Sequence, residues 1–335
     1  MAVYGSVLES RLNLEFANEI KQFDYMMVSE SSVDYILESK FSIKEVFKKL
    51  KELWIKFKEW VKEKFKKLRE FIKKILHKTK TEVIDKKIQK PNPDNGKSYA
   101  LAVRSFNNAN NSDQQTDGEP KNLVFSYNTV SRTSDDHLTQ SIKKITIATN
   151  VSEESKKSNY RKENNNSEYI DYIKQFYEED TNRADTELSK IEDTDYSNIK
   201  KVDVVVSFKN VSTDNFISSV FKEVTNIKSA TDDINEKLSY LNRQLDELEK
   251  IISDYDTVVK EYDKVINETE RKNDTDEDDV KSQGIVVSIL VNAMKGDISR
   301  LRSALLHWSK HSGNLTSAAT QNHLIYTRLS TLINK

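Results

Sequence analysis

Two histidines, His307 and His311, lie four residues apart in a helical pattern near the C-terminus. This spacing places both imidazoles on one face of a helix, where two nitrogen ligands could hold a metal ion. A zinc-protease helix also needs glutamate directly after the first histidine, and Trp308 stands there instead. No third ligand is evident, since His323 belongs to a later segment. We therefore interpret both histidines as surface or seam residues and expect no metal site.

An acidic run at residues 274–279 places carboxylates at the first, third and fifth positions of a calcium-binding loop. Such a loop then requires glycine at its sixth position and glutamate at its twelfth. Those positions hold Asp279 and Ile285. We predict a solvated acidic turn, whose negative charge favours the start of the next helix.

Other catalytic groups are missing from the sequence. The 335 residues include no cysteine, which excludes disulfides, thiolate metal sites and cysteine nucleophiles. The 6 glycines are scattered, and neither a phosphate-binding glycine loop nor a serine nucleophile elbow is present. We expect a protein that is not an enzyme, with no catalytic, cofactor-binding or metal-binding residues and no cofactor.

The composition favours long solvated helices over one large globular core. Only 36% of the residues are hydrophobic, 32% are charged, and the net charge is −1. Long helices suit this balance because each needs only a narrow apolar stripe. No run approaches the ~18 apolar residues of a membrane span, and the N-terminus lacks the pattern of a secretory signal. The expected fold class is therefore mainly α in a soluble protein.

The most conspicuous element is a basic amphipathic helix at residues 42–80, which Ser42 and Glu45 can cap as a capping box. It carries 15 Lys/Arg and 5 Asp/Glu, and apolar residues recur at spacings of three and four. Its candidate interaction face consists of Phe47, Leu50, Trp54, Phe57, Trp60, Phe65 and Phe71. Its candidate basic face consists of Lys48, Lys49, Lys56, Lys62, Lys66, Lys67, Lys73 and Lys74.

Three partners for this helix remain open. Its apolar face can pack on the C-terminal helices or on copies of itself, leaving the lysines as a solvated rim. It can lie on an anionic membrane with Trp54 and Trp60 at the interface. Its lysines can neutralise phosphates of a nucleic acid without reading sequence. Its place between a leader and a linker favours a tethered element with its own partner over a piece of the central core.

The rest of the chain divides by composition. Residues 1–40 form an acidic leader with 7 Asp/Glu against 3 Lys/Arg. The helix segment spans 41–90, and prolines, glycine and polar residues mark a linker at 91–121. A small α+β unit is predicted at 122–211. Its expected elements are strands at 122–130, 142–151 and 202–211 and a helix at 168–191.

Residues 212–335 are predicted to be helical, with an unusually regular apolar repeat. The repeat first runs through Ile234, Leu238, Leu241, Leu245, Leu248, Ile252, Tyr255, Val259, Tyr262 and Ile266. After a charged break it continues through Val287, Val291, Met294, Ile298, Leu301, Leu305 and Trp308. A stop is predicted at Gly313 and Asn314 before a last helix. The two segments favour a long antiparallel hairpin or coiled coil, with pairing between chains as the alternative.

The order of the N-terminal segments carries a family resemblance. The leader ends in YILESK at residues 35–40, and FSIKEVFKKLKELWIKFKEWVKEKFKKL follows. Over residues 30–80 this resembles virion structural proteins of large tailed bacteriophages of Gram-positive hosts. The resemblance implies a non-enzymatic protein packaged in the particle, in the capsid interior. It also implies proteolytic processing between Glu38 and Ser39, because such head proteins are trimmed after an (Ile or Leu)-x-Glu sequence.

The first functional hypothesis is therefore a structural or assembly protein of a bacteriophage virion, with other virion proteins or itself as partner. A membrane-docking or membrane-active protein that uses residues 42–80 is the alternative. A non-specific nucleic-acid-binding protein is the second alternative. The expected location is the virion, and otherwise the host cytoplasm.

Overall fold

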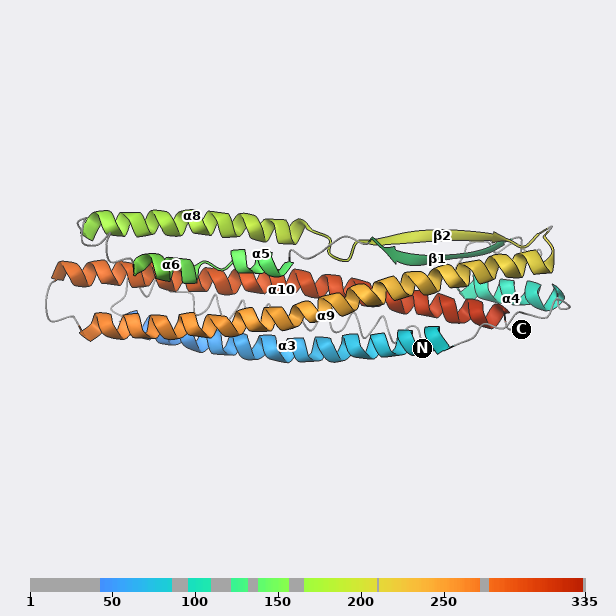
Figure 1. The fold of residues 1–335 in the computed structure, drawn as a ribbon, viewed down its shortest axis with the longest axis horizontal. Helices are drawn as coiled ribbons and strands as arrows, with labels where there is room; N and C mark the ends of the chain where they lie inside the picture. Colours follow the sequence, from blue (N-terminus) through green and yellow to red (C-terminus); the bar gives the residue numbers. More distant parts are fainter. Residues whose placement is uncertain are drawn as a thin grey trace.

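The computed structural model describes residues 43–85, 96–109, 122–131, 138–156, 166–209, 211–271 and 277–333. These residues form an elongated, mainly helical body with a two-stranded sheet at one end (Figure 1). The elements follow in the order α3 (Ile43–Asp85), α4 (Gly96–Ala109), β1 (Asn122–Val130), α5 (Leu138–Lys144), α6 (Ala148–Ser155), α8 (Asn166–Asp193), β2 (Ile199–Ser207), α9 (Thr213–Arg271) and α10 (Glu277–Ile333).

The two C-terminal helices form an antiparallel hairpin within the chain, as the apolar repeat predicted (Figure 1). With 59 residues, α9 is about 90 Å long at 1.5 Å per residue. The repeat residues from Ile234 to Tyr262 and from Val287 to Trp308 are buried. Ile266 has a side chain outside the described part of the structure. A narrow seam therefore joins the helices from Ile234 to Tyr262 of α9 and from Val287 to Trp308 of α10.

The predicted stop at Gly313 and Asn314 is wrong, because α10 continues through both residues to Ile333. Glycine inside a helix costs about 1 kcal/mol relative to alanine. The neighbouring His311, Ser312 and Leu315 are buried, so packing on both sides of the glycine offsets this cost. Local propensity is overridden here by tertiary contacts.

The first and third predicted strands pair, whereas the second is helical. Strand β1 pairs antiparallel with β2 from Asn122 opposite Ser207 to Val130 opposite Ile199. Residues 142–151 instead contribute to α5, a turn and α6. Their buried apolar residues are Ile142, Ile145, Ile147, Ala148 and Val151, among which a spacing of three recurs, and this spacing is typical of a helix and not of a strand. The segment predicted as linker also contains a helix, α4.

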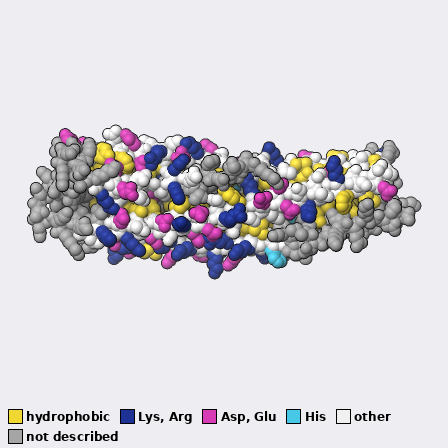
Figure 2. Space-filling model, in the orientation of Figure 1, with side chains coloured by type: hydrophobic (Ala, Val, Ile, Leu, Met, Phe, Trp, Pro, Cys, Tyr) yellow, Lys and Arg dark blue, Asp and Glu magenta, His cyan; other side chains and the backbone are white. Residues whose placement is uncertain are grey.

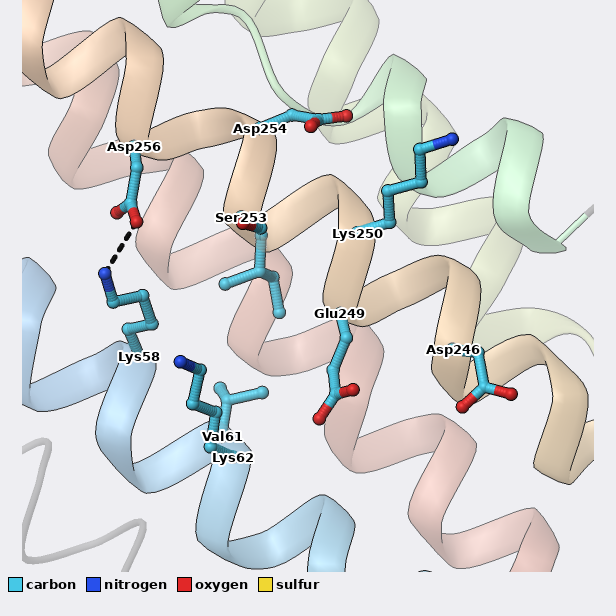
Figure 3. Close-up of a pocket in the computed structure, with 10 residues that line it drawn as sticks. Lys58, Val61, Lys62, Asp246, Glu249, Lys250, Ser253, Asp254 and Asp256 are labelled. Atoms are coloured by element: carbon cyan, nitrogen blue, oxygen red, sulfur yellow. Dashed lines mark hydrogen bonds and ion pairs between the residues drawn. The ribbon is translucent and has the colours of Figure 1, made fainter.

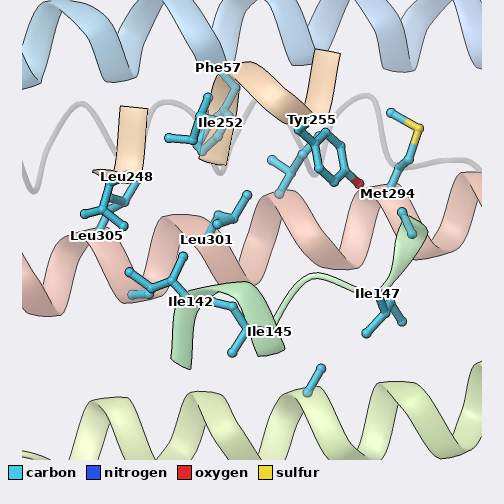
Figure 4. Packing of buried hydrophobic residues seen from close by; sticks show 14 of the residues in the cluster. Phe57, Ile142, Ile145, Ile147, Leu248, Ile252, Tyr255, Met294, Leu301 and Leu305 are labelled. Carbon is cyan, nitrogen blue, oxygen red and sulfur yellow. The ribbon is translucent and has the colours of Figure 1, made fainter. Parts of the chain in front are cut away.

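The buried side chains form two clusters. The larger lies among α3, α5, α6, α8, α9 and α10, and Figure 4 shows it from α3 at the top of the view to α8 at the bottom. The smaller joins β1 and α4 to the start of α9 and the end of α10. Because α9 and α10 run through both clusters, they connect the helical body to the sheet. Within the described ranges, no helix has the length and apolar character needed to cross a bilayer.

The seam predicts a large cost for truncating one of its leucines. Leu245→Ala should lower the free energy of unfolding by about 2–5 kcal/mol, because Leu245 is fully buried. Glu247→Ala, on the exposed side of the same helix, should change it by less than about 0.5 kcal/mol. Urea unfolding followed by circular dichroism measures both. Equal effects of the two changes would contradict the seam.

Candidate functional site: the interface of α3 with α9

The apolar face of α3 is buried against the hairpin, so the helix belongs to the central core. This corrects the expectation of a tethered element with its own partner. Phe47, Trp54, Phe57 and Phe65 are buried, and Trp60 and Phe71 are half-buried. The side chain of Leu50 lies outside the described part of the structure, as do Glu38 and Ser39 of the predicted processing site. Ser42 and the side chain of Glu45, the predicted cap, also lie outside it.

Trp54 illustrates how closely α3 is fitted to α9. Its side chain is 1% exposed, and its ring centroid lies 4.7 Å from that of Tyr255. The indole Nε1–H donates a hydrogen bond to Asp256 Oδ1 at 2.7 Å. A buried tryptophan normally needs such a partner for its N–H. The partner of this tryptophan is therefore an acidic residue of the same chain, next to a seam residue.

Cations of α3 pair with a row of carboxylates on α9. Lys51 Nζ lies 2.7 Å from Asp263 Oδ2, and Lys58 Nζ lies 2.6 Å from Asp256 Oδ2. Farther along, Arg69 Nη2 lies 2.7 Å from Asp246 Oδ1 and 2.9 Å from Glu249 Oε2. As the residue numbers rise on α3 they fall on α9, so the two helices run antiparallel. Each pair is partly exposed and contributes about 0.2–1 kcal/mol, so the row sets register more than stability.

The acidic row was not predicted, although the sequence contains its pattern. Glu249, Asp256 and Asp263 are seven residues apart, and each directly follows a seam residue. A heptad position beside the seam is where a third helix would contact the hairpin. The repeat therefore specified an acidic flank suited to a basic helix.

Ionisation at this interface favours the paired state. Partial desolvation would raise the pKa of Asp256, but the bonds from Lys58 and Trp54 and the nearby charges outweigh it and lower that pKa. The hydrogen bond to Glu249 raises the pKa of Arg69 above its usual value, although partial desolvation acts in the opposite direction. Both groups therefore carry their charge throughout the neutral range.

The basic face of α3 is exposed but interrupted by acids. Lys48, Lys56, Lys62, Lys66, Lys67, Lys73 and Lys74 are all exposed, whereas the side chain of Lys49 lies outside the described part. Glu52, Glu59, Glu63 and Glu70 are exposed on the same helix, and Lys67 Nζ pairs with Glu63 Oε1 at 2.6 Å. Figure 2 shows basic and acidic side chains interspersed along this side of the body. The face is therefore of mixed charge.

An open groove of about 580 Å³ lies between α3 and α9 (Figure 3). Its walls carry four carboxylates, from Asp246, Glu249, Asp254 and Asp256. Three lysines also line it: Lys58 and Lys62 from α3, and Lys250 from α9. These charges nearly balance, so the groove favours neither an anion nor a cation. The described residues contain no group of three or more side chains that could hold a metal ion.

The two histidines hold α10 to the chain that connects α8 with β2. His307 Nε2 lies 2.8 Å from the Thr194 carbonyl oxygen and 2.8 Å from His311 Nε2. His311 Nδ1 lies 3.0 Å from Asp195 Oδ1. The Ser197 N–H lies 3.3 Å from His311 Nδ1 and 3.0 Å from Asp195 Oδ1, so the tautomer of His311 depends on which of the two accepts this hydrogen bond. When Asp195 accepts it, Nδ1–H of His311 donates to Asp195 and Nε2–H of His307 donates to His311 and Thr194. The Nε2 atoms that would face a metal are thereby engaged.

Burial and the charges around His311 act on its ionisation. Burial lowers the pKa of His311 to about 4, and His307 and Lys310 act in the same direction while Asp195 opposes them. Partial desolvation would raise the pKa of Asp195, but the hydrogen bonds from Ser197 and Asn198 outweigh it and lower that pKa. His311 is only 4% exposed, so its neutral form is the one the fold accommodates.

A second buried polar cluster centres on Asp297 of α10, which is 0% exposed. Its carboxylate accepts hydrogen bonds from the backbone N–H groups of Ile147 and Ala148, each at 2.9 Å. Tyr255 Oη donates at 2.9 Å and Arg300 Nη2 at 2.8 Å. Burial raises the pKa of Tyr255 well above its usual range, and the charge of Asp297 adds to this, so the hydroxyl stays a donor. Every partner of this carboxylate belongs to the fold, which makes the cluster a structural anchor for α6.

The acidic row predicts that two neighbouring lysines of α3 respond differently to charge reversal. Lys58→Glu should lower the free energy of unfolding by about 1–2 kcal/mol, because it replaces an ion pair by repulsion from Asp256. Lys56→Glu, on the exposed side, should change it by less than about 0.5 kcal/mol. The difference should shrink in 1 M NaCl, where exposed charges are screened within about 3 Å. Denaturant unfolding at two salt concentrations measures this, and identical behaviour of the two variants would contradict the pairing.

The histidine pair predicts a loss of stability on mild acidification. The pKa of His311 is about 4 in the folded chain, below the ~6.5 of an unfolded histidine. The unfolded state therefore binds the proton first as the pH falls. Stability should drop between pH ~6.5 and ~4, by up to about 3 kcal/mol from this residue.

Unfolding free energies measured across that pH range test this expectation. His311→Gln should flatten the decline, whereas His77→Gln, at an exposed position of α3, should leave it unchanged. An unaltered decline in His311→Gln would show that other groups cause it.

No family model, curated protein or solved structure matches this chain. Support for a function therefore comes from the residues of the chain and their arrangement.

Proposed function

We propose that the protein is a non-enzymatic structural or assembly protein of a bacteriophage virion, in which an elongated helical body acts as a rigid spacer. The observation that supports the spacer role is the long hairpin of α9 and α10, two helices whose buried residues belong to both clusters. Two long helices that connect both clusters fix distances along the length of the body. The assignment to a virion rests on the resemblance of residues 30–80.

The packing of α3 supports this role over membrane docking. A membrane-surface helix needs its apolar face free, but Trp54 and Phe57 are 1% and 0% exposed in the core. Moving each large side chain out of the core would forfeit about 1.5–3 kcal/mol. The cost rises with each further residue of the face, so docking through it would require the bundle to open.

The charge pattern also supports this role over non-specific nucleic-acid binding. Such binding grows with the number of phosphates that cations neutralise. The exposed lysines of α3 alternate with glutamates, and the acidic row of α9 lies beside them. Neighbouring carboxylates lower the local positive potential, so an extended phosphate backbone would meet both signs of charge.

Mass spectrometry of purified particles, from a phage whose genome encodes the chain, tests the proposal. The protein should be present in the particles, and an N-terminus at Ser39 is expected if the leader is removed. Its absence from particles would contradict the virion assignment.

Two binding measurements on the purified full chain test the alternatives. The chain should not float with vesicles of anionic phospholipid, and it should show no salt-dependent retention of double-stranded DNA. Flotation would favour membrane docking. DNA affinity that falls steeply with salt would favour the nucleic-acid alternative.

A further inference from the structure

The two edges of the small sheet differ in the hydrogen bonds that their outward-facing backbone groups make. The outer edge of β1 is occupied by two asparagine side chains, one from α4 and one from α10. Asn107 Nδ2 donates to the Asn122 carbonyl at 2.8 Å, and Val124 N–H donates to Asn107 Oδ1 at 3.2 Å. Asn322 Nδ2 donates to the Asn128 carbonyl at 2.8 Å, and Asn128 N–H donates to Asn322 Oδ1 at 2.7 Å. Each amide exchanges two hydrogen bonds with the strand, as a neighbouring strand would.

These contacts determine which way the backbone N–H and C=O groups of β2 point. Because Asn128 and its even-numbered neighbours direct their backbone groups outward, the odd-numbered residues of β1 bond to β2. Their partners in the register are the even-numbered residues Lys200, Val202, Val204 and Val206. The N–H and C=O groups of the odd-numbered residues of β2 must therefore point to the opposite edge. In the part of the chain that the structure describes, the sheet has two strands, and none lies on that edge.

The same odd-numbered residues also present exposed side chains. Lys201 and Asp203 are exposed and lie 3.4 Å apart at their charged atoms. Val205 is 63% exposed, the highest value among the large hydrophobic side chains in the described part of the chain. Exposed strand edges invite pairing with another chain, and proteins usually obstruct them with charge or proline. Here the charges are of both signs, with one valine beside them.

We propose that the free edge of β2 is a self-association site, at which a second copy of the chain pairs antiparallel through its own β2 to give a four-stranded sheet. Two-fold pairing places each residue opposite a partner so that the two numbers have a constant sum. Centring the axis on Val202 places Lys201 opposite Asp203 of the second copy, and Asp203 opposite Lys201. It also places Ile199 opposite Val205. Both ion pairs and both apolar pairs then form at residues whose backbone groups point to the free edge.

The neighbouring registers are disfavoured by the same side chains. Centring the axis on Asp203 places two Asp203 carboxylates opposite one another. Centring it on Lys201 does the same with two lysines. Like charges directly opposite are destabilising, so these two registers are disfavoured relative to the one centred on Val202. The charges that hinder pairing with other strands thus favour one partner, a second copy of the chain in the matching register.

The position of β2 fixes the shape of such a dimer. The strand lies near one end of the body and runs along its long axis (Figure 1). An antiparallel pair through β2 would therefore join the two copies by their sheet ends, with the helical bodies extending in opposite directions. Contact through one edge is small, so the dimer should be of modest affinity. This inference does not depend on the assignment to a virion.

Sedimentation equilibrium of the full chain over the micromolar to millimolar range tests the proposal, with four variants. Lys201→Asp and Asp203→Lys, each alone, should weaken self-association about tenfold or more, because each turns two attractive pairs into repulsive ones. The double variant K201D/D203K should recover the wild-type dissociation constant. Lys209→Asp, an exposed reversal just after the strand, is the matched control and should leave it unchanged.

A mixture of the two single variants gives the sharpest result. One copy then carries two aspartates and the other two lysines at positions 201 and 203, so a heterodimer should form where neither variant alone dimerises. A wild-type chain that stays monomeric throughout the range would overturn the proposal. A dimer that the charge variants do not weaken would overturn it as well, because association would then use another surface. Circular dichroism should show unchanged helix content in every variant.

Discussion

Each long helix of this protein can bury only a narrow stripe of its surface, and α9 divides that stripe among three neighbours. Its seam residues face α10, and the residue after several of them faces α3, as Tyr255 and Asp256 show at Trp54. Its first turns pack under β1 instead. The packing of α9 against all three neighbours therefore depends on one heptad register, since a shift of α9 by one residue would misplace all three contacts at once.

A buried charge reinforces this frame at the α5–α6 connection. Removing Asp297 and Arg300 from water is costly, and attraction between them offsets that cost only when every remaining hydrogen-bonding group is satisfied. The Ile147 and Ala148 N–H groups, at the start of α6, meet this requirement. Only one placement of α6 on the hairpin does so. Any other placement of α6 would leave the buried carboxylate without these hydrogen bonds, and the free-energy cost of that loss fixes the position of α6. The surrounding apolar contacts alone would tolerate small shifts.

The sequence predicted what regular repetition specifies. The seam from Ile234 to Tyr262 and the strand at 122–130 followed from their periods, whereas the same heptad repeat favoured the in-chain hairpin but also allowed pairing between chains. The strand predicted at residues 142–151 is wrong because β-branched residues were weighed above spacing. The helix end predicted at Gly313 is wrong because the effect of helix propensity is weaker than that of burial on both sides of the glycine.

The candidate site was harder to predict, because its geometry depends on two distant segments. The apolar and basic residues of α3 were identified, but net charge over the helix could not distinguish lysines paired with α9 from exposed ones. That distinction depends on angular position relative to a partner, as Lys58 and Lys56 show. The hydrogen bonds of Asn107 and Asn322 to β1 could not be predicted from the sequence, since a lone asparagine is compatible with almost any exposed position.

The distribution of surface chemistry gives the body two different kinds of surface. Among the described side chains of α3, alternating signs of charge leave no extended apolar or single-sign patch, which opposes lateral association of parallel bodies. At the sheet end, Asn107 and Asn322 bond to one strand edge, while no strand among the described residues lies on the other edge. Backbone pairing is directional, whereas mixed surface charge is not. Contacts formed by the proposed pairing at that edge would follow the long axis of the body, as the proposed spacer role requires.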